Sequence, residues 1–98
     1  MVAGLGAMVG CSQPHRFEVD ISGVEVDRAE LTLYNETTAM THEGNIVSAE
    51  RANRADGSGQ IAIYRVGGEP IICPIGYVSS GESEPHRFVT RNGTCQPV

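Results

Sequence analysis

The chain has 98 residues, a net charge of −5 from 12 acidic and 7 basic side chains, 5% aromatic residues and no tryptophan. A chain of this length forms one small domain, whose core is marginal unless a disulfide, a metal or a partner adds stability. The acidic balance leaves no electrostatic footprint for phosphates and the few aromatic residues offer no stacking platforms, so nucleic-acid binding is excluded.

The first ten residues are uncharged and almost wholly apolar or glycine, and they end at a cysteine. An apolar run that leads to small residues is typical of the end of an export signal. The segment Met8-Val9-Gly10-Cys11 resembles the lipobox of bacterial lipoproteins. The resemblance implies that Cys11 becomes the lipidated first residue of the mature chain. The alternative is an ordinary apolar N-terminal segment.

We therefore divide the chain into a truncated signal or apolar N-terminal segment (1–10), a linker (11–16) and a single β-domain (17–98). The first segment is called truncated because it has no basic start and is well below the ~18 residues of a membrane-spanning helix. In the lipoprotein family, a serine such as Ser12 after the lipidated cysteine is compatible with sorting to the outer membrane. The expected location is the cell envelope, facing the periplasm, or outside the cell.

Three cysteines are an odd number, and the lipobox resemblance assigns Cys11 to a lipid. Cys73 and Cys95 are then left as a pair, which can form a disulfide in an oxidising compartment. Closing this loop would contribute about 3 kcal/mol. A zinc site would need clustered ligands, but the three histidines are scattered and no CxxC motif occurs, so we expect no metal and no cofactor.

Apolar residues recur at every second position from residue 17 onward, which is the period of a β-strand with one buried face. The pattern predicts strands at 17–21, 24–27 and 29–34, with a turn or bulge at Ser22-Gly23. The acidic residues that alternate with the apolar ones are expected to form a solvated face.

The middle of the chain has no strong period. Residues 35–44 are polar and predict a connecting loop with at most one irregular strand. Residues 46–55 fit a short helix or a strand, and we favour the strand because their small apolar side chains form a poor helical stripe.

The segment at 56–59 (DGSG) predicts a tight turn. It resembles the middle of an EF-hand calcium loop, but the first and last ligand positions fall on Arg54 and Arg65, which repel the cation. Two further strands are predicted at 60–66 and 71–78. Pro74 has no amide N–H, so its strand should have an edge position or a bulge there.

The two later cysteines are predicted to bracket a β-hairpin. If they face each other directly, Tyr77 lies opposite Arg91 and the tip holds residues 80–88. Phe88 would then point away from the cysteines, and a bulge at Asn92-Gly93 would return it to the core.

The tetrapeptide Pro-His-Arg-Phe occurs twice, at residues 14–17 and 85–88, where it opens the first and last predicted strands. One hypothesis pairs the two arginines on neighbouring strands to bind an anion through guanidinium forks. We favour a simpler interpretation: the repeat is a coincidence, or it marks two equivalent strand starts at which the phenylalanine anchors the core. The candidate binding surface combines polar residues of the two repeats with the exposed tip of the predicted hairpin. Its members are Arg16, Gly81, Glu82, Ser83, Glu84, His86 and Arg87.

Short strands separated by turn residues predict an all-β fold, a small antiparallel β-sandwich or barrel, with one short helix near 46–55 as the alternative for that segment. No set of residues has a spacing that supports catalysis, so we expect a protein that is not an enzyme. The expected function is a cell-envelope lipoprotein domain that binds a protein or glycan partner and touches the membrane only through its lipid. The alternative is a periplasmic or secreted hydrolase inhibitor that uses the 79–87 loop.

Overall fold

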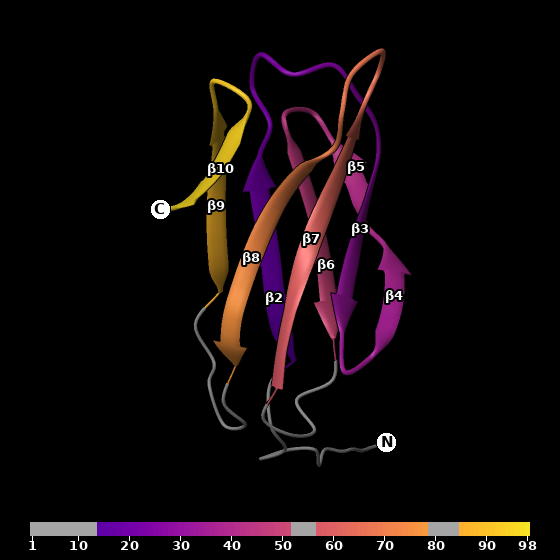
Figure 1. Ribbon diagram of the computed structural model, residues 1–98. Coiled ribbons are helices and arrows are strands. Elements are labelled where there is room, and N and C mark those ends of the chain that lie inside the picture. The colour runs from indigo at the N-terminus through magenta and orange to yellow at the C-terminus, as the bar shows by residue number, and fades with distance from the viewer. Residues whose placement is uncertain (1–13, 52–56, 79–84) are drawn as a thin grey trace, which may run out of the picture.

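The computed structural model describes residues 14–51, 57–78 and 85–98, and these form two β-sheets packed face to face (Figure 1). The described residues contain no helix, so the predicted all-β sandwich is confirmed. Its strands are β2 (His15–Asp20), β3 (Val26–Leu33), β4 (Glu36–Ala39), β5 (Thr41–Glu43), β6 (Ile46–Arg51), β7 (Gly57–Arg65), β8 (Ile71–Val78), β9 (His86–Arg91) and β10 (Thr94–Pro97).

The five-stranded sheet has the order β10-β9-β2-β6-β5, and the four-stranded sheet has the order β4-β3-β7-β8. Neighbouring strands are antiparallel except β2 and β9, which run parallel in the middle of the five-stranded sheet. Parallel neighbours need a crossover rather than a tight turn, and here the chain leaves the sheet and returns between them.

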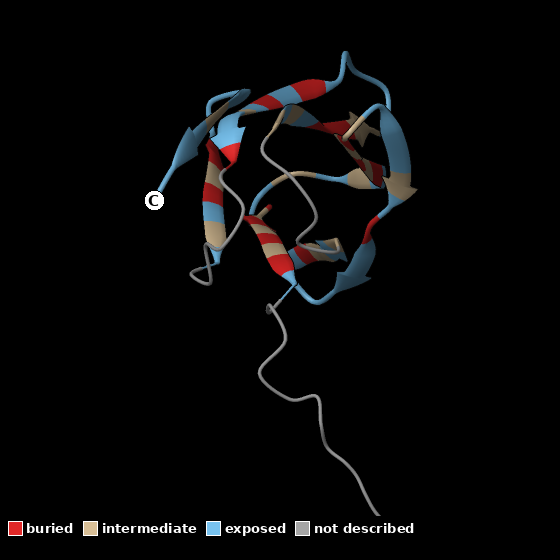
Figure 2. Ribbon diagram, turned by 90° about the horizontal axis from the view of Figure 1, so that it is seen from below, coloured by how far each residue is buried: buried red, intermediate tan, exposed pale blue. Residues whose placement is uncertain are grey.

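The core follows from the period-two pattern. Along β2, Phe17 and Val19 are fully buried, and along β3 the same holds for Leu31 and Leu33. Figure 2 shows buried residues alternating with more exposed ones along the strands around a common interior. Each such aliphatic or aromatic side chain contributes about 1.5–3 kcal/mol when it leaves water. Burial of one face of each sheet therefore holds the sandwich together.

Several element predictions need correction. In place of the two strands predicted at 24–27 and 29–34 there is one strand, β3, which spans Val26–Leu33 and has a register shift between Val26 and Arg28. The predicted loop at 35–44 contains β4 and β5. Residues 46–51 are a strand, as favoured, and not a helix, whereas 52–56 lie outside the described residues. Residues 57–59, predicted as a turn, belong to β7.

The predicted hairpin between the cysteines is also wrong, because β8 and β9 lie in different sheets. Tyr77 pairs with Ser58 of β7, and Arg91 pairs with Thr94 of β10. Asn92 and Gly93 have φ of 52° and 78°, which suits the two-residue turn that joins β9 to β10. Phe88 is buried at 6% exposure without any bulge at that turn.

Pro74 behaves as predicted. Its strand, β8, is an edge of the four-stranded sheet. The register of β7 and β8 shifts between Gly59 and Gln60, where Gly76 and Pro74 are the respective partners. The missing amide N–H of Pro74 is therefore accommodated by both devices that the sequence suggests, an edge and an irregular pairing.

The strands bring loops to two opposite ends of the sandwich. The turns at 21–25, 66–70 and 92–93 lie at the upper end in Figure 1, together with the turn between β5 and β6. The start of β2 at His15 lies at the lower end. The two ends are the places where side chains from both sheets can meet.

Candidate functional site

The sequence-predicted surface is only partly within the described residues. Gly81, Glu82, Ser83 and Glu84 lie outside them, as does the predicted lipidation site Cys11. The remaining members, Arg16, His86 and Arg87, lie on β2 and β9. The parallel pairing of these strands brings the two Pro-His-Arg-Phe segments side by side, offset by two residues, since Phe17 is the partner of His86.

Strand alternation separates each histidine from its arginine. His15 is 1% exposed and lies on the inner face with Phe17, whereas Arg16 faces outward. The ring of Phe17 stacks on that of His86, with centroids 4.9 Å apart, and the His15 ring lies 6.1 Å from the His86 ring. The histidines thus extend the core at the lower end. The interpretation of the phenylalanines as core anchors is confirmed, since Phe17 and Phe88 are both buried.

The two arginines of the repeat do share one side of the sheet, but a carboxylate lies between them. Arg16 Nε donates to Glu18 Oε2 at 2.6 Å, and Arg87 Nε lies 3.5 Å from Glu18 Oε1. Arg16 also contacts Glu50 at 3.3 Å. The pKa of Arg16 is raised, chiefly by its hydrogen bond to Glu18. Because Glu18 already occupies both guanidinium groups, this face is a poor site for an external anion.

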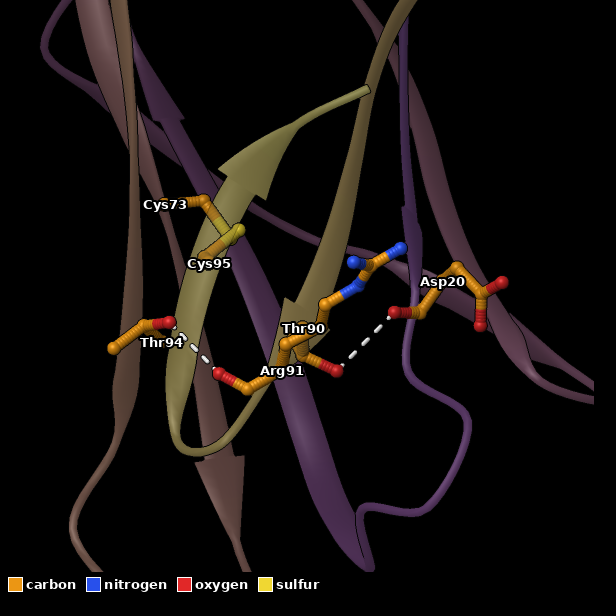
Figure 3. Close-up of a disulfide and its surroundings, with 6 residues drawn as sticks. All are labelled: Asp20, Cys73, Thr90, Arg91, Thr94 and Cys95. Atoms are coloured by element: carbon orange, nitrogen blue, oxygen red, sulfur yellow. Dashed lines mark hydrogen bonds between the residues drawn. A yellow bond between two sulfur atoms is a disulfide. The ribbon is translucent and has the colours of Figure 1, made fainter.

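The predicted disulfide between Cys73 and Cys95 is present, with an S–S distance of 2.06 Å. It joins β8 of one sheet to β10 of the other, and so links the two sheets at one side of the sandwich (Figure 3). Cys73 is fully buried in the core. The bond therefore stabilises the packing of the two layers rather than a hairpin.

A pocket of about 610 Å³ opens at the upper end of the sandwich, and Arg16, His86 and Arg87 are not among the residues that line it. It is lined by residues 22–25 of the β2–β3 turn, by Arg65, Val66 and Ile71 around the β7–β8 turn, and by residues 90–93. A cavity of this size is within the range of ligand-binding pockets. The three loops come from both sheets, so only the folded sandwich assembles it.

Hydrogen bonds hold the three walls together. Val66 N donates to Glu25 O at 2.9 Å, which joins the β7–β8 turn to the β2–β3 turn. Thr90 Oγ1 donates to Asp20 O at 3.2 Å, which joins β9 to the end of β2 (Figure 3). These bonds cross between elements that are distant in the sequence, so the pocket is shaped before any ligand arrives.

The Asp20 side chain organises the turn that forms one wall. Its Oδ1 accepts hydrogen bonds from Ser22 N at 2.9 Å and from Ser22 Oγ at 2.6 Å. These two bonds favour the ionised carboxylate and lower the pKa of Asp20. An aspartate that bonds to the residue two positions later is a local turn device.

The two arginines of the pocket differ from the other arginines in the described part of the chain, which contains six in all. Four of the six form ion pairs with carboxylates: Arg16, Arg28, Arg51 and Arg87. The two that form none with any described residue are Arg65 and Arg91, and both line the pocket.

Arg65 is held in place by the backbone. Its Nε donates to Glu69 O at 2.7 Å, and its guanidinium lies against Gly68, where an added Cβ would be 3.3 Å from Arg65 Cζ. The remaining N–H groups of a guanidinium can still bind a carboxylate in a fork. The pocket therefore presents cationic donors whose charge no described side chain has neutralised.

Sequence inspection missed this site because its members are single residues at the ends of different strands. Arg65 and Arg91 are 26 positions apart and belong to no motif. The only local signal was their position at predicted strand ends next to turn residues, where binding residues are often found.

In residues 14–51, 57–78 and 85–98, no three His, Cys, Asp or Glu side chains lie close enough together to hold a metal ion. The same residues include no helix that could span a membrane.

Comparison with known proteins finds no matching family model, no similar curated protein and no matching solved structure.

Proposed function

We propose that this chain is a non-enzymatic binding domain of the cell envelope, which holds a protein or glycan partner at the pocketed end of its sandwich. One observation carries the proposal: Arg65 and Arg91, the two arginines without an ion pair among the described residues, line the same preformed pocket. Arginines left unpaired beside an open cavity are typical of sites that recognise an anionic group on a partner.

The envelope location is supported by the disulfide, since such bonds persist in oxidising compartments and are rare in the reducing cytoplasm. The described part of the chain starts just before β2, which begins at the lower end of the sandwich, and a lipid on Cys11 would lie three positions before residue 14. The turns that line the pocket lie at the opposite end of the sandwich (Figure 1). Anchoring at Cys11 would thus direct the pocket away from the membrane, toward a partner.

The anchor is tested by the mass of the mature N-terminus in the native host. We expect a chain that begins at Cys11 with the added mass of its lipid. A Cys11→Ser variant should lose the modification and its membrane fraction. A mature chain that keeps Met1, or one with an unmodified Cys11, would remove the lipoprotein part of the proposal.

The binding site is tested by exchanging the unpaired arginines and, separately, the paired ones. The full-length tagged chain is purified from solubilised envelopes of the host as wild type, as Arg65→Gln/Arg91→Gln, and as the matched control Arg16→Gln/Arg87→Gln. Each variant loses two positive charges, so a difference between them reports position and not net charge. Equal thermal unfolding curves establish that each variant is folded.

We expect a partner that co-purifies with the wild type and the control at equal levels and falls at least tenfold with the pocket variant. Its protein or glycan nature is established by mass spectrometry with and without glycan-degrading enzymes. A pocket variant that retains the partner at the wild-type level contradicts the proposed site.

A further inference from the structure

The pocket combines charge with an apolar wall, and this combination restricts the ligand. Arg65 and Arg91 supply the cationic donors, while Val24, Val66 and Ile71 supply aliphatic surface in the same cavity. Val66 is 58% exposed at the mouth, whereas Ile71 is 2% exposed and forms part of the core beneath. A ligand that fills this cavity therefore needs an anionic group and an aliphatic group within a few bonds of each other.

The charge of the lining indicates a single negative charge on the ligand. Two arginines and one glutamate, Glu25, line the pocket, which gives a formal charge of +1. A carboxylate matches this charge. A phosphate dianion or a chain of uronic acids would bring additional negative charge next to Glu25, where like charges repel.

The uncharged part of the lining favours a peptide over a sugar. None of the described residues that line the pocket is aromatic, so they offer no flat ring on which a sugar could pack. Aliphatic side chains from three separate positions instead suit an aliphatic side chain. In a peptide, a carboxylate and a side chain share one Cα atom only at the C-terminal residue.

We propose that the pocket binds the free C-terminal carboxylate of a protein partner whose last residue is aliphatic. This inference rests on the proposed binding function and names the ligand of the same site. Arg65 and Arg91 hold the carboxylate, Glu25 accepts the N–H of the last residue, and the aliphatic wall contacts its side chain. The hydrogen bonds from Val66 to Glu25 and from Thr90 to Asp20 keep the three walls in place before binding.

The probe for this inference is a short peptide, acetyl-Ala-Ala-Leu with a free carboxylate, added to the isotope-labelled full chain in an NMR titration of backbone amides. We expect saturable shifts at Gly23, Arg91 and Gly93. The same peptide with a C-terminal amide should bind at least tenfold more weakly, and so should acetyl-Ala-Ala-Ser with a free carboxylate. Glucuronate and inorganic phosphate should produce weaker shifts than the leucine peptide.

The opposite results overturn the assignment. Equal binding of the amide shows that the carboxylate is not recognised, and equal binding of the serine peptide shows that the aliphatic wall is not used. Tighter binding of glucuronate or phosphate assigns the pocket to another anion. No saturable shift with the leucine peptide also rejects the proposal.

A matched pair of variants on one strand tests the role of the unpaired arginine. Arg91→Gln should weaken binding of the leucine peptide at least tenfold, whereas Arg87→Gln, also on β9 but paired with Glu18, should leave it unchanged. An equal effect of both variants, or of neither, contradicts the assignment. Unchanged amide spectra away from the pocket establish that both variants are folded.

Failure of this inference can be told from failure of the proposed function. If the leucine peptide does not bind but the Arg65→Gln/Arg91→Gln chain still loses its envelope partner, the ligand class is wrong and the binding site stands. If that double variant keeps its partner, the proposed function falls, whatever the peptide titration shows.

Discussion

At the scale of single residues, Asp20 connects the turn and the wall of the pocket. Its carboxylate accepts two hydrogen bonds from Ser22, and its backbone carbonyl accepts one from Thr90 of β9. The two hydrogen bonds from Ser22 hold the turn that leads into Gly23, which has φ of 81°. One short side chain therefore orients a loop that the pocket depends on.

Replacing Ser22 with Ala removes the hydroxyl donor but keeps the backbone donor, so the pKa of Asp20 should rise toward its ordinary value. A carboxyl whose pKa is lowered in the folded state adds stability above its unfolded pKa, and this stability is lost as the pH falls through the folded pKa. The variant should therefore be less stable than wild type at neutral pH, and the contribution from ionisation should vanish in acid, once the pH lies below the folded pKa.

Carboxyl NMR titration measures the pKa, and denaturant unfolding at the two pH values measures stability. Ser58→Ala, at an exposed position of β7, is the control and should leave the pKa of Asp20 unchanged. If the pKa of Asp20 is the same in Ser22→Ala and wild type, the hydroxyl is not the cause of the shift.

At the scale of elements, β7 is the strand on which the four-stranded sheet depends, because it pairs with both β3 and β8. Among the described glycines, Gly59 leaves the least room for a Cβ. A Cβ built on it would lie 2.1 Å from Thr32 O and 3.2 Å from Leu33 Cδ1. No side chain fits there without movement of the backbone of β3.

Gly59→Ala should therefore destabilise the domain by about 1–3 kcal/mol, the usual cost of overpacking a tight interior. Gly57→Ala on the same strand is the matched control, since its Cβ would meet only the side chain of Tyr34, at 3.3 Å. Urea unfolding should show less than half the destabilisation for the control. Equal stability of Gly59→Ala and wild type would contradict the close approach of β3 and β7.

At the scale of the whole molecule, the two sides of the sandwich are closed by different means. On one side the chain passes from β4 in one sheet to β5 in the other through Met40, whose backbone N–H donates to Ala29 O at 2.9 Å. On the other side the chain passes from β8 of the four-stranded sheet to β9 of the five-stranded sheet, and the disulfide joins the edge strands β8 and β10. The cysteine pair thus adds a covalent link between the two edge strands.

A Cys73→Ala/Cys95→Ala variant should lose about 3 kcal/mol of stability, the loop-closure contribution expected for a bond that spans 22 positions. Reduction of the wild type should produce a loss of the same size, because it removes the same constraint on the unfolded chain. Guanidinium unfolding with and without a reductant measures both. A double variant as stable as the oxidised wild type would show that packing alone holds β8 and β10 together.

The sequence by itself determined the local features. Alternation along residues 17–21 and 29–33 predicts which side chains are buried, because the two faces of a strand differ at every residue. The strand at 71–78 and the edge character of Pro74 also follow from local chemistry. The Cys73–Cys95 pair followed from the assignment of Cys11 to a lipid, and the structure confirms the bond while the lipid remains a prediction.

Only the tertiary structure decided which strands pair. The predicted hairpin failed because the Asn92-Gly93 turn pairs β9 with β10, which leaves β8 to pair with β7 across the earlier turn. The period-two pattern is the same for either partner strand, so it cannot decide which of the two pairs.

The pocket could not be predicted from the sequence for a related reason. Arg65 belongs to one sheet and Arg91 to the other, so they line a common pocket only after the two layers have packed.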